Sequence, residues 1–371
     1  MKNLFTLCFL FLAFGAAAQS LANPPYLEGN KMFDAGRYRE AVEFYSKSVY
    51  IEPTFAQAFN NRGLAKLELN DHKGALADFN KVLSLDPRNS EAYRNRATMK
   101  FRLNDYAGAL ADYDKAITFA PKDADLLFNR GLTKVLLKRQ QEAIADFDKS
   151  IALNPAFQDA YLERAYAKMN TGNAAGALAD FGELLKRDPK SFNAYYNRAL
   201  ALEKMQKTAD ALADYNQAIK LSPSFGEAYF NRSLIKFSQK DYAGAAEDLN
   251  KVISLKPKMA EAYANRALAR GRLGKDREAL ADYNQALALK PQNAGNLTER
   301  GSIKMKLGDF SGAVTDFTQA ISLNPKSAAA YYGRGSSRVA LKQKDPACAD
   351  LQKAQQLGSR EASNLLAQNC R

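Results

Sequence analysis

The chain has 371 residues, of which 46% are apolar and 25% are charged, with only 12 prolines and 21 glycines. This composition excludes a collagen-like, low-complexity or largely disordered chain, and the one histidine, His72, excludes any catalytic or metal site that needs two histidines. The net charge of +13 points to nucleic acid or another polyanion as a class of partner that must be considered.

Residues 1–18 have the pattern of a secretory signal peptide. Lys2 is followed by an apolar run from Leu4 to Phe14 and then by small residues up to Ala18. The run is too short to span a membrane, and no other segment could, so we expect no integral membrane span. We therefore expect an exported protein, periplasmic or extracellular, which argues against nucleic acid as a partner. The alternative is a cytosolic protein with an apolar first helix.

Prolines recur with a spacing of 34 residues, and this spacing defines a repeat. When the proline is counted as position 32, residues 22–361 divide into ten units. Position 20 is alanine in every unit, and position 8 is glycine, alanine or serine. The prolines are residues 53, 87, 121, 155, 189, 223, 257, 291 and 325, and the units are 22–55, 56–89, 90–123, 124–157, 158–191, 192–225, 226–259, 260–293, 294–327 and 328–361.

Each unit is predicted to form two helices. Apolar residues recur at helical spacing in two stretches per unit, and pairs such as Asn70-Asp71 or Gly308-Asp309 mark the turn between them. The proline stands where the second helix must end. A single hairpin cannot bury its apolar face, so the ten hairpins are predicted to stack on one another.

Position 7 is arginine and position 23 is aspartate in units two to ten, whereas unit one lacks both. This joint absence predicts that each arginine pairs with the aspartate of its own hairpin, in a ladder of partly buried ion pairs. Ligand binding is the alternative role. The residues are Arg62, Arg96, Arg130, Arg164, Arg198, Arg232, Arg266, Arg300 and Arg334, with Asp78, Asp112, Asp146, Asp180, Asp214, Asp248, Asp282, Asp316 and Asp350.

A second row of basic residues lies at position 11 in eight units. These side chains either contact an anionic polymer or lay their methylene groups on the helix interface with their charges in water. The residues are Lys66, Lys100, Lys134, Lys168, Lys236, Arg270, Lys304 and Arg338.

The units resemble the tetratricopeptide repeat family, whose pattern has a small residue at position 8, alanine at 20, an aromatic ring at 24 and proline at 32. Residues 74–79 and 228–232 carry the pattern closely, and the resemblance covers residues 22–361. It implies an all-α, right-handed superhelical solenoid whose first helices line a concave groove. It also implies a scaffold without catalytic residues, cofactor or metal site, which binds an extended peptide or a partner protein.

The family's groove is lined by positions 2, 5, 6, 9, 12 and 13, and in units four to seven these positions are rich in apolar residues. Position 6 adds a row of amides, which the family's co-chaperones use to hold a peptide backbone. The alternative is that positions 9 and 12 partly pack against neighbouring helices and that the asparagines satisfy local backbone groups. The candidate groove residues are Phe128, Asn129, Leu132, Leu162, Tyr166, Tyr196, Asn197, Leu200, Phe230, Asn231, Leu234, Phe237 and Asn265.

Two cysteines remain after residues 1–18, Cys348 and Cys370. An even number in an oxidising compartment favours a disulfide, while two free thiols or a redox role are the alternatives. The bond would hold a capping helix, expected within residues 360–371, over the end of unit ten. This end of the chain resembles the cysteine-bracketed endings of exported bacterial repeat proteins. The second functional hypothesis is a structural or adhesive envelope component that binds an anionic polymer through position 11.

Overall fold

The computed structural model describes residues 23–370, and the predicted signal peptide lies outside this range. Within the range, none of the helices combines the length and the apolar character that crossing a membrane requires. The chain forms two compact parts, which we call the N-terminal half, up to Leu184, and the C-terminal half, from Leu185.

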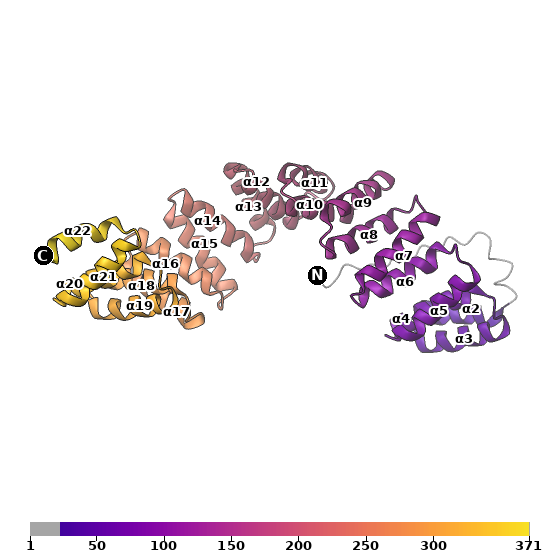
Figure 1. Ribbon diagram of the computed structural model, residues 1–371. Helices are drawn as coiled ribbons and strands as arrows, with labels where there is room; N and C mark the ends of the chain where they lie inside the picture. The colour runs from indigo at the N-terminus through magenta and orange to yellow at the C-terminus, as the bar shows by residue number, and fades with distance from the viewer. Residues whose placement is uncertain (1–22, 371) are drawn as a thin grey trace. The chain divides into compact units, whose positions relative to one another are not determined.

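Residues 23–370 form twenty-one α-helices and no strand, which confirms the predicted all-α repeat fold. The helices form ten successive hairpins and one final helix (Figure 1). The hairpins are α2 (Pro24–Asp34) with α3 (Tyr38–Ile51), α4 (Ala56–Glu68) with α5 (His72–Leu85), α6 (Ser90–Arg102) with α7 (Tyr106–Phe119), α8 (Ala124–Leu136) with α9 (Gln140–Leu153), α10 (Gln158–Asn170) with α11 (Ala174–Arg187), α12 (Phe192–Lys204) with α13 (Thr208–Leu221), α14 (Gly226–Ser238) with α15 (Tyr242–Leu255), α16 (Ala260–Arg272) with α17 (Asp276–Leu289), α18 (Ala294–Lys306) with α19 (Phe310–Leu323), and α20 (Ala328–Ala340) with α21 (Lys344–Gln356); the final helix is α22 (Arg360–Asn369).

The turn inside each hairpin follows from two residues. Position 15 has a left-handed backbone in all ten units, and asparagine or glycine stands there in six, as at Asn70 with φ 60°. In five units the next residue is an aspartate or asparagine whose side chain caps the second helix, as the carboxylate of Asp71 does by accepting a hydrogen bond from the backbone N–H of Gly74 at 2.9 Å. The turn pairs in the sequence therefore stop one helix and start the next.

Small residues at two positions let the helices of a hairpin approach closely. The alanine at position 20 is fully buried in every unit. At position 8, a Cβ on Gly131 would lie 2.6 Å from the ring of Phe147, which is closer than real Cβ contacts. The ring at position 24 thus occupies the space that the missing side chain leaves. The core consists of these contacts repeated along each half.

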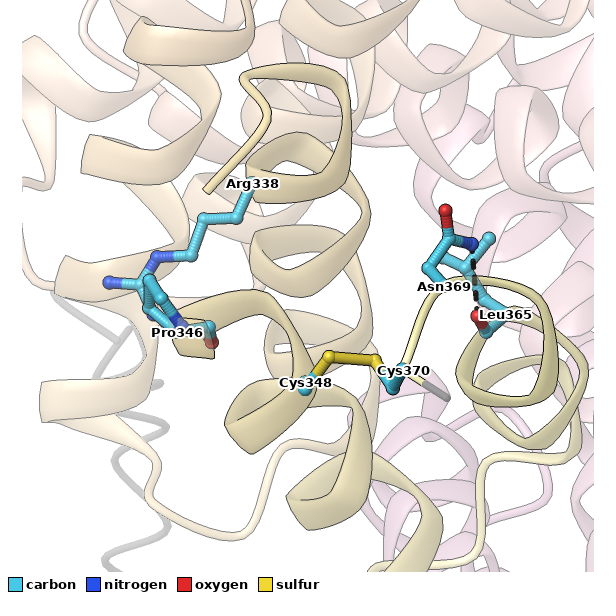
Figure 2. Close-up of a disulfide and its surroundings, with 6 residues drawn as sticks. All are labelled: Arg338, Pro346, Cys348, Leu365, Asn369 and Cys370. Atoms are coloured by element: carbon cyan, nitrogen blue, oxygen red, sulfur yellow. Dashed lines mark hydrogen bonds between the residues drawn. A yellow bond between two sulfur atoms is a disulfide. The ribbon is translucent and has the colours of Figure 1, made fainter. Parts of the chain in front are cut away.

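The last hairpin is covered by α22, which contacts α20 and α21 (Figure 1). Ala362 is buried against Leu351 and Ala354, so the apolar end of unit ten does not face water. A disulfide joins Cys348 in α21 to Cys370, the residue after α22, with the two Cα atoms 5.8 Å apart (Figure 2). The bond therefore ties the capping helix to the hairpin that it covers.

Candidate functional site

The predicted ladder of arginine–aspartate pairs is confirmed in all nine units that carry it. Each arginine donates from Nε and Nη2 to the two carboxylate oxygens of its aspartate, at 2.5–3.0 Å. The aspartates are only 2–5% exposed. A two-pronged contact of this kind needs the planar guanidinium, so lysine would not replace these arginines.

The arginines also connect neighbouring units. In eight of them Nη1 donates to the side chain at position 25 of the preceding unit, as Arg232 does to Asn216 at 2.6 Å. In seven the guanidinium lies over the ring at position 4, with Cζ 5.2–5.7 Å from the ring centre. Burial alone would lower the pKa of Arg232, but the hydrogen bond and charge of Asp248 raise it overall. One residue type therefore holds both the hairpin and the stack.

The basic row at position 11 belongs to the same ladder. All eight side chains place a charged nitrogen 2.6–2.9 Å from the aspartate of their own unit, and they are only 10–24% exposed. The prediction that their charges are solvated is wrong. Because these charges pair with buried aspartates, they are not available to an anionic polymer. The structure therefore gives no support to polymer binding through this row.

The basic residues at position 11 also explain much of the net charge. Nine aspartates are paired with nine arginines and eight position-11 cations, which leaves an excess of eight positive charges out of the formal +13. In unit six the position is Leu202, and within residues 23–370 Asp214 pairs with Arg198 alone. The pattern was visible in the sequence, because unit one has Met32 at position 11 and lacks the aspartate as well.

The amide row at position 6 is partly used within the protein. Asn95 donates to Oδ1 of Asn60 at 2.9 Å, and Asn231 donates to the hydroxyl of Tyr196 at 3.2 Å. Asn61 makes the same kind of contact to unit one. In each case the amide links a first helix to the first helix of the preceding unit. These NH₂ groups therefore stabilise the stack through side-chain contacts between units, and not through the local backbone groups that the alternative interpretation predicted.

Three further amides of the row differ from these. Asn197 donates to the backbone carbonyl of Asn193 at 2.8 Å. The side chains of Asn129 and Asn265 form no hydrogen bond within residues 23–370, so each can still donate to and accept from a ligand.

The apolar candidates fall into two groups. Phe128 is buried, and its ring lies 4.7 Å from that of Phe157 and 5.8 Å from that of Phe147, so its assignment to the groove is wrong because it fills the core. Leu234 is 45% exposed in the middle of α14. Tyr166 is 37% exposed, and its ring meets Phe181 edge to face. The remaining candidates are half-buried: Leu132, Leu162, Tyr196, Leu200, Phe230 and Phe237.

Models of the tetratricopeptide repeat match residues 60–124, 100–161, 162–224, 196–260 and 260–293, and a TPR repeat model matches residues 301–341. No curated protein matches the chain. Among solved structures, the C-terminal part of a TPR repeat-containing protein from Cytophaga hutchinsonii is 18% identical, with a TM-score of 0.59, over 65% of this chain and 98% of that chain. A tetratricopeptide repeat protein from Parabacteroides merdae is 25% identical, with a TM-score of 0.47, over 66% and 97%. YrrB, described as a TPR protein with an unusual peptide-binding site, is 23% identical, with a TM-score of 0.47, over 50% and 95%.

Because one family model covers residues 60–260 without a gap, which is more than half of the chain, the chain belongs to the tetratricopeptide repeat family.

Proposed function

We propose that this protein is an exported, non-catalytic scaffold that binds an extended peptide or a segment of a partner protein in the groove lined by its first helices. Membership of the tetratricopeptide repeat family supports the scaffold role. The signal-like residues 1–18 and the Cys348–Cys370 disulfide support export, since disulfides persist in oxidising compartments.

The observation that carries the binding surface is the exposure of Leu234. Most exposed leucines of the first helices lie at helix ends, whereas Leu234 lies mid-helix at position 9, where the family's groove is. The half-buried Phe230 and Asn231 lie one turn earlier on the same face of α14. An apolar side chain flanked by an aromatic ring and an amide oxygen suits a peptide with an apolar residue and a free backbone N–H.

Affinity capture of the mature protein from its own cell envelope tests this surface. Leu234→Ser removes the exposed apolar contact, and Leu323→Ser is the matched control, because Leu323 is 41% exposed at the end of a second helix, α19. We expect a discrete protein that is captured by the parent and by the control but lost with Leu234→Ser. Equal capture by all three proteins would refute the first-helix surface.

Export is tested separately by fractionating the cells and measuring the mass of the mature chain. We expect a periplasmic or extracellular chain without residues 1–18. A cytoplasmic chain that keeps Met1 would refute export and leave the binding surface to be judged by the capture experiment.

A further inference from the structure

The C-terminal half contains a recess of about 350 Å³ beside the first helices of units eight and nine. It lies between α16, α17 and α18, and the loop that precedes α20 closes one side. Small side chains such as Ala264 and Gly295 leave the space open. Its volume lies at the lower end of the range for small-molecule sites, which is room for one side chain or a small ligand.

A tyrosine whose hydroxyl has no partner within the described residues lines this recess. Tyr283 is only 2% exposed and stands at position 24, where three other units also have tyrosine. The hydroxyl of Tyr45 donates to Asn30 at 2.8 Å, and that of Tyr113 lies 3.1 Å from the hydroxyl of Thr98. In unit six the tyrosine donates to a glutamate of its own hairpin. The hydroxyl of Tyr283 forms no hydrogen bond within residues 23–370.

The sequence of unit eight explains why this hydroxyl has no partner. The partners in units one and three stand at position 9, and the partner in unit six stands at position 12. In unit eight these positions are Leu268 and Gly271, which offer no polar side chain. The hydroxyl of Tyr283 therefore borders the open space of the recess, where a ligand can take the place of water as its hydrogen-bond partner.

Among the residues that line the recess, the charged one is Glu299. This glutamate stands at position 6 of unit nine, where six other units have asparagine, and it lines the recess together with Asn265. Glu299 forms no ion pair within the described chain. Burial first, and then the negative charge of Glu299, raise the pKa of Tyr283, whereas Arg272 at the end of α16 lowers it. Glu299 and Tyr283 therefore border the same recess.

We propose that this recess binds a lysine or arginine side chain of a peptide that lies on the first helices. Glu299 supplies the opposite charge, and the amide oxygen of Asn265 and the hydroxyl oxygen of Tyr283 accept hydrogen bonds from the cation. An anionic group would face the unpaired carboxylate and is excluded. The assignment rests on the proposed function, because it makes the recess one subsite of the peptide-binding surface.

Two substitutions test the subsite without disturbing the core. Tyr283→Phe removes only the hydroxyl, and phenylalanine already stands at position 24 in units two, four, five and nine. Glu299→Gln removes only the charge of an exposed side chain. Glu247→Gln is the matched control, because Glu247 is exposed on a second helix, α15.

The probes are the N-acetyl methylamides of lysine and arginine, with that of glutamine as the neutral comparison. Tyrosine-ring NMR signals of the full mature chain report binding, and the signal that disappears in Tyr283→Phe identifies Tyr283. We expect a saturable shift of this signal with the two cationic probes, about tenfold weaker binding in Glu299→Gln, and no change in Glu247→Gln. No saturable shift, an equal response to the glutamine probe, or unchanged affinity in Glu299→Gln would overturn the proposal.

Peptides separate this outcome from failure of the proposed function. Short extended peptides that differ only by one central lysine or glutamine are titrated against the parent and Glu299→Gln. Equal binding of both peptides to both proteins would leave the peptide surface standing and remove the subsite. Cationic probes that bind at Tyr283 when no peptide binds would support the recess and refute the peptide-binding function.

Discussion

Removal of Asp248 is a quantitative test of the ion-pair ladder. Its buried carboxylate accepts hydrogen bonds from Arg232 at 2.5 and 2.8 Å, and Lys236 Nζ lies 2.9 Å away. Asp248→Ala therefore leaves two cations without a partner, and their side chains are only 16% and 22% exposed. Unit six offers a natural comparison, since Asp214→Ala leaves a single cation that is 29% exposed.

The expected magnitudes follow from this difference. Removing one partner of a buried ion pair typically costs 3–5 kcal/mol, and because the two cations keep some contact with water we expect about 3 kcal/mol for Asp248→Ala. With one cation that is more exposed, Asp214→Ala should cost about 1.5 kcal/mol. Lys236→Leu gives unit seven the pattern of unit six, so in that background the cost of Asp248→Ala should fall by roughly 1.5 kcal/mol.

The measurement is urea unfolding followed by circular dichroism, combined with hydrogen exchange of α14 and α15. Exchange is needed because a long repeat array can open in parts, and the local opening free energy then reports the affected hairpin. Costs for Asp248→Ala and Asp214→Ala that agree within about 0.5 kcal/mol would contradict the reasoning, since mutations at independent sites add within about that margin. An unchanged cost in the Lys236→Leu background would do the same.

Three further predictions concern single interactions. Tyr113→Phe should cost about 1 kcal/mol in urea unfolding, because its hydroxyl has a partner, whereas Tyr283→Phe should be neutral. Burial raises the pKa of Glu163, so the folded state holds its proton more tightly and stability falls as the pH rises past the ordinary glutamate pKa. Glu163→Gln should therefore raise the urea midpoint near pH 7 but not near pH 4, and an equal shift at both would contradict the assignment. Reduction of the Cys348–Cys370 disulfide should destabilise α22 by about 3 kcal/mol, seen as faster exchange confined to that helix; faster exchange throughout the C-terminal half would contradict a local role.

The fold could be predicted because the residues that the fold requires recur along the ten units. Alanine at position 20, the small residue at position 8 and the turn pairs each correspond to a close approach or a cap in the structure. The arginine–aspartate ladder could be predicted for a different reason: unit one lacks both partners, as expected of two positions that interact directly. In a repeat protein, a unit that departs from the pattern can thus be compared with the other units of the same chain.

The burial of Phe128 could not be predicted in the same way, and the signal for the role of position 11 is weaker, because unit six keeps Asp214 although it has Leu202 at that position. Lys236 and Asp248 lie twelve residues apart on two helices, so their contact depends on how the helices of the hairpin cross. Phe128 is covered partly by Phe157, which stands in the turn before the next unit. Both facts concern the space between helices, whereas the periodicity of one helix reports only which face is apolar.

The ladder also indicates where ligand recognition can vary. Positions 4, 7, 11 and 23 all interact with one another in six of the ten units, so a substitution there costs stability before it changes binding. Positions 6 and 9 carry no such requirement: position 6 changes from asparagine to Glu299, and position 9 ranges from Asn30 to Leu234 and Leu268. Because the excess positive charge belongs largely to the ladder, it says little about the ligand. The charge that can select a ligand is the unpaired carboxylate of Glu299, and its sign favours a cation.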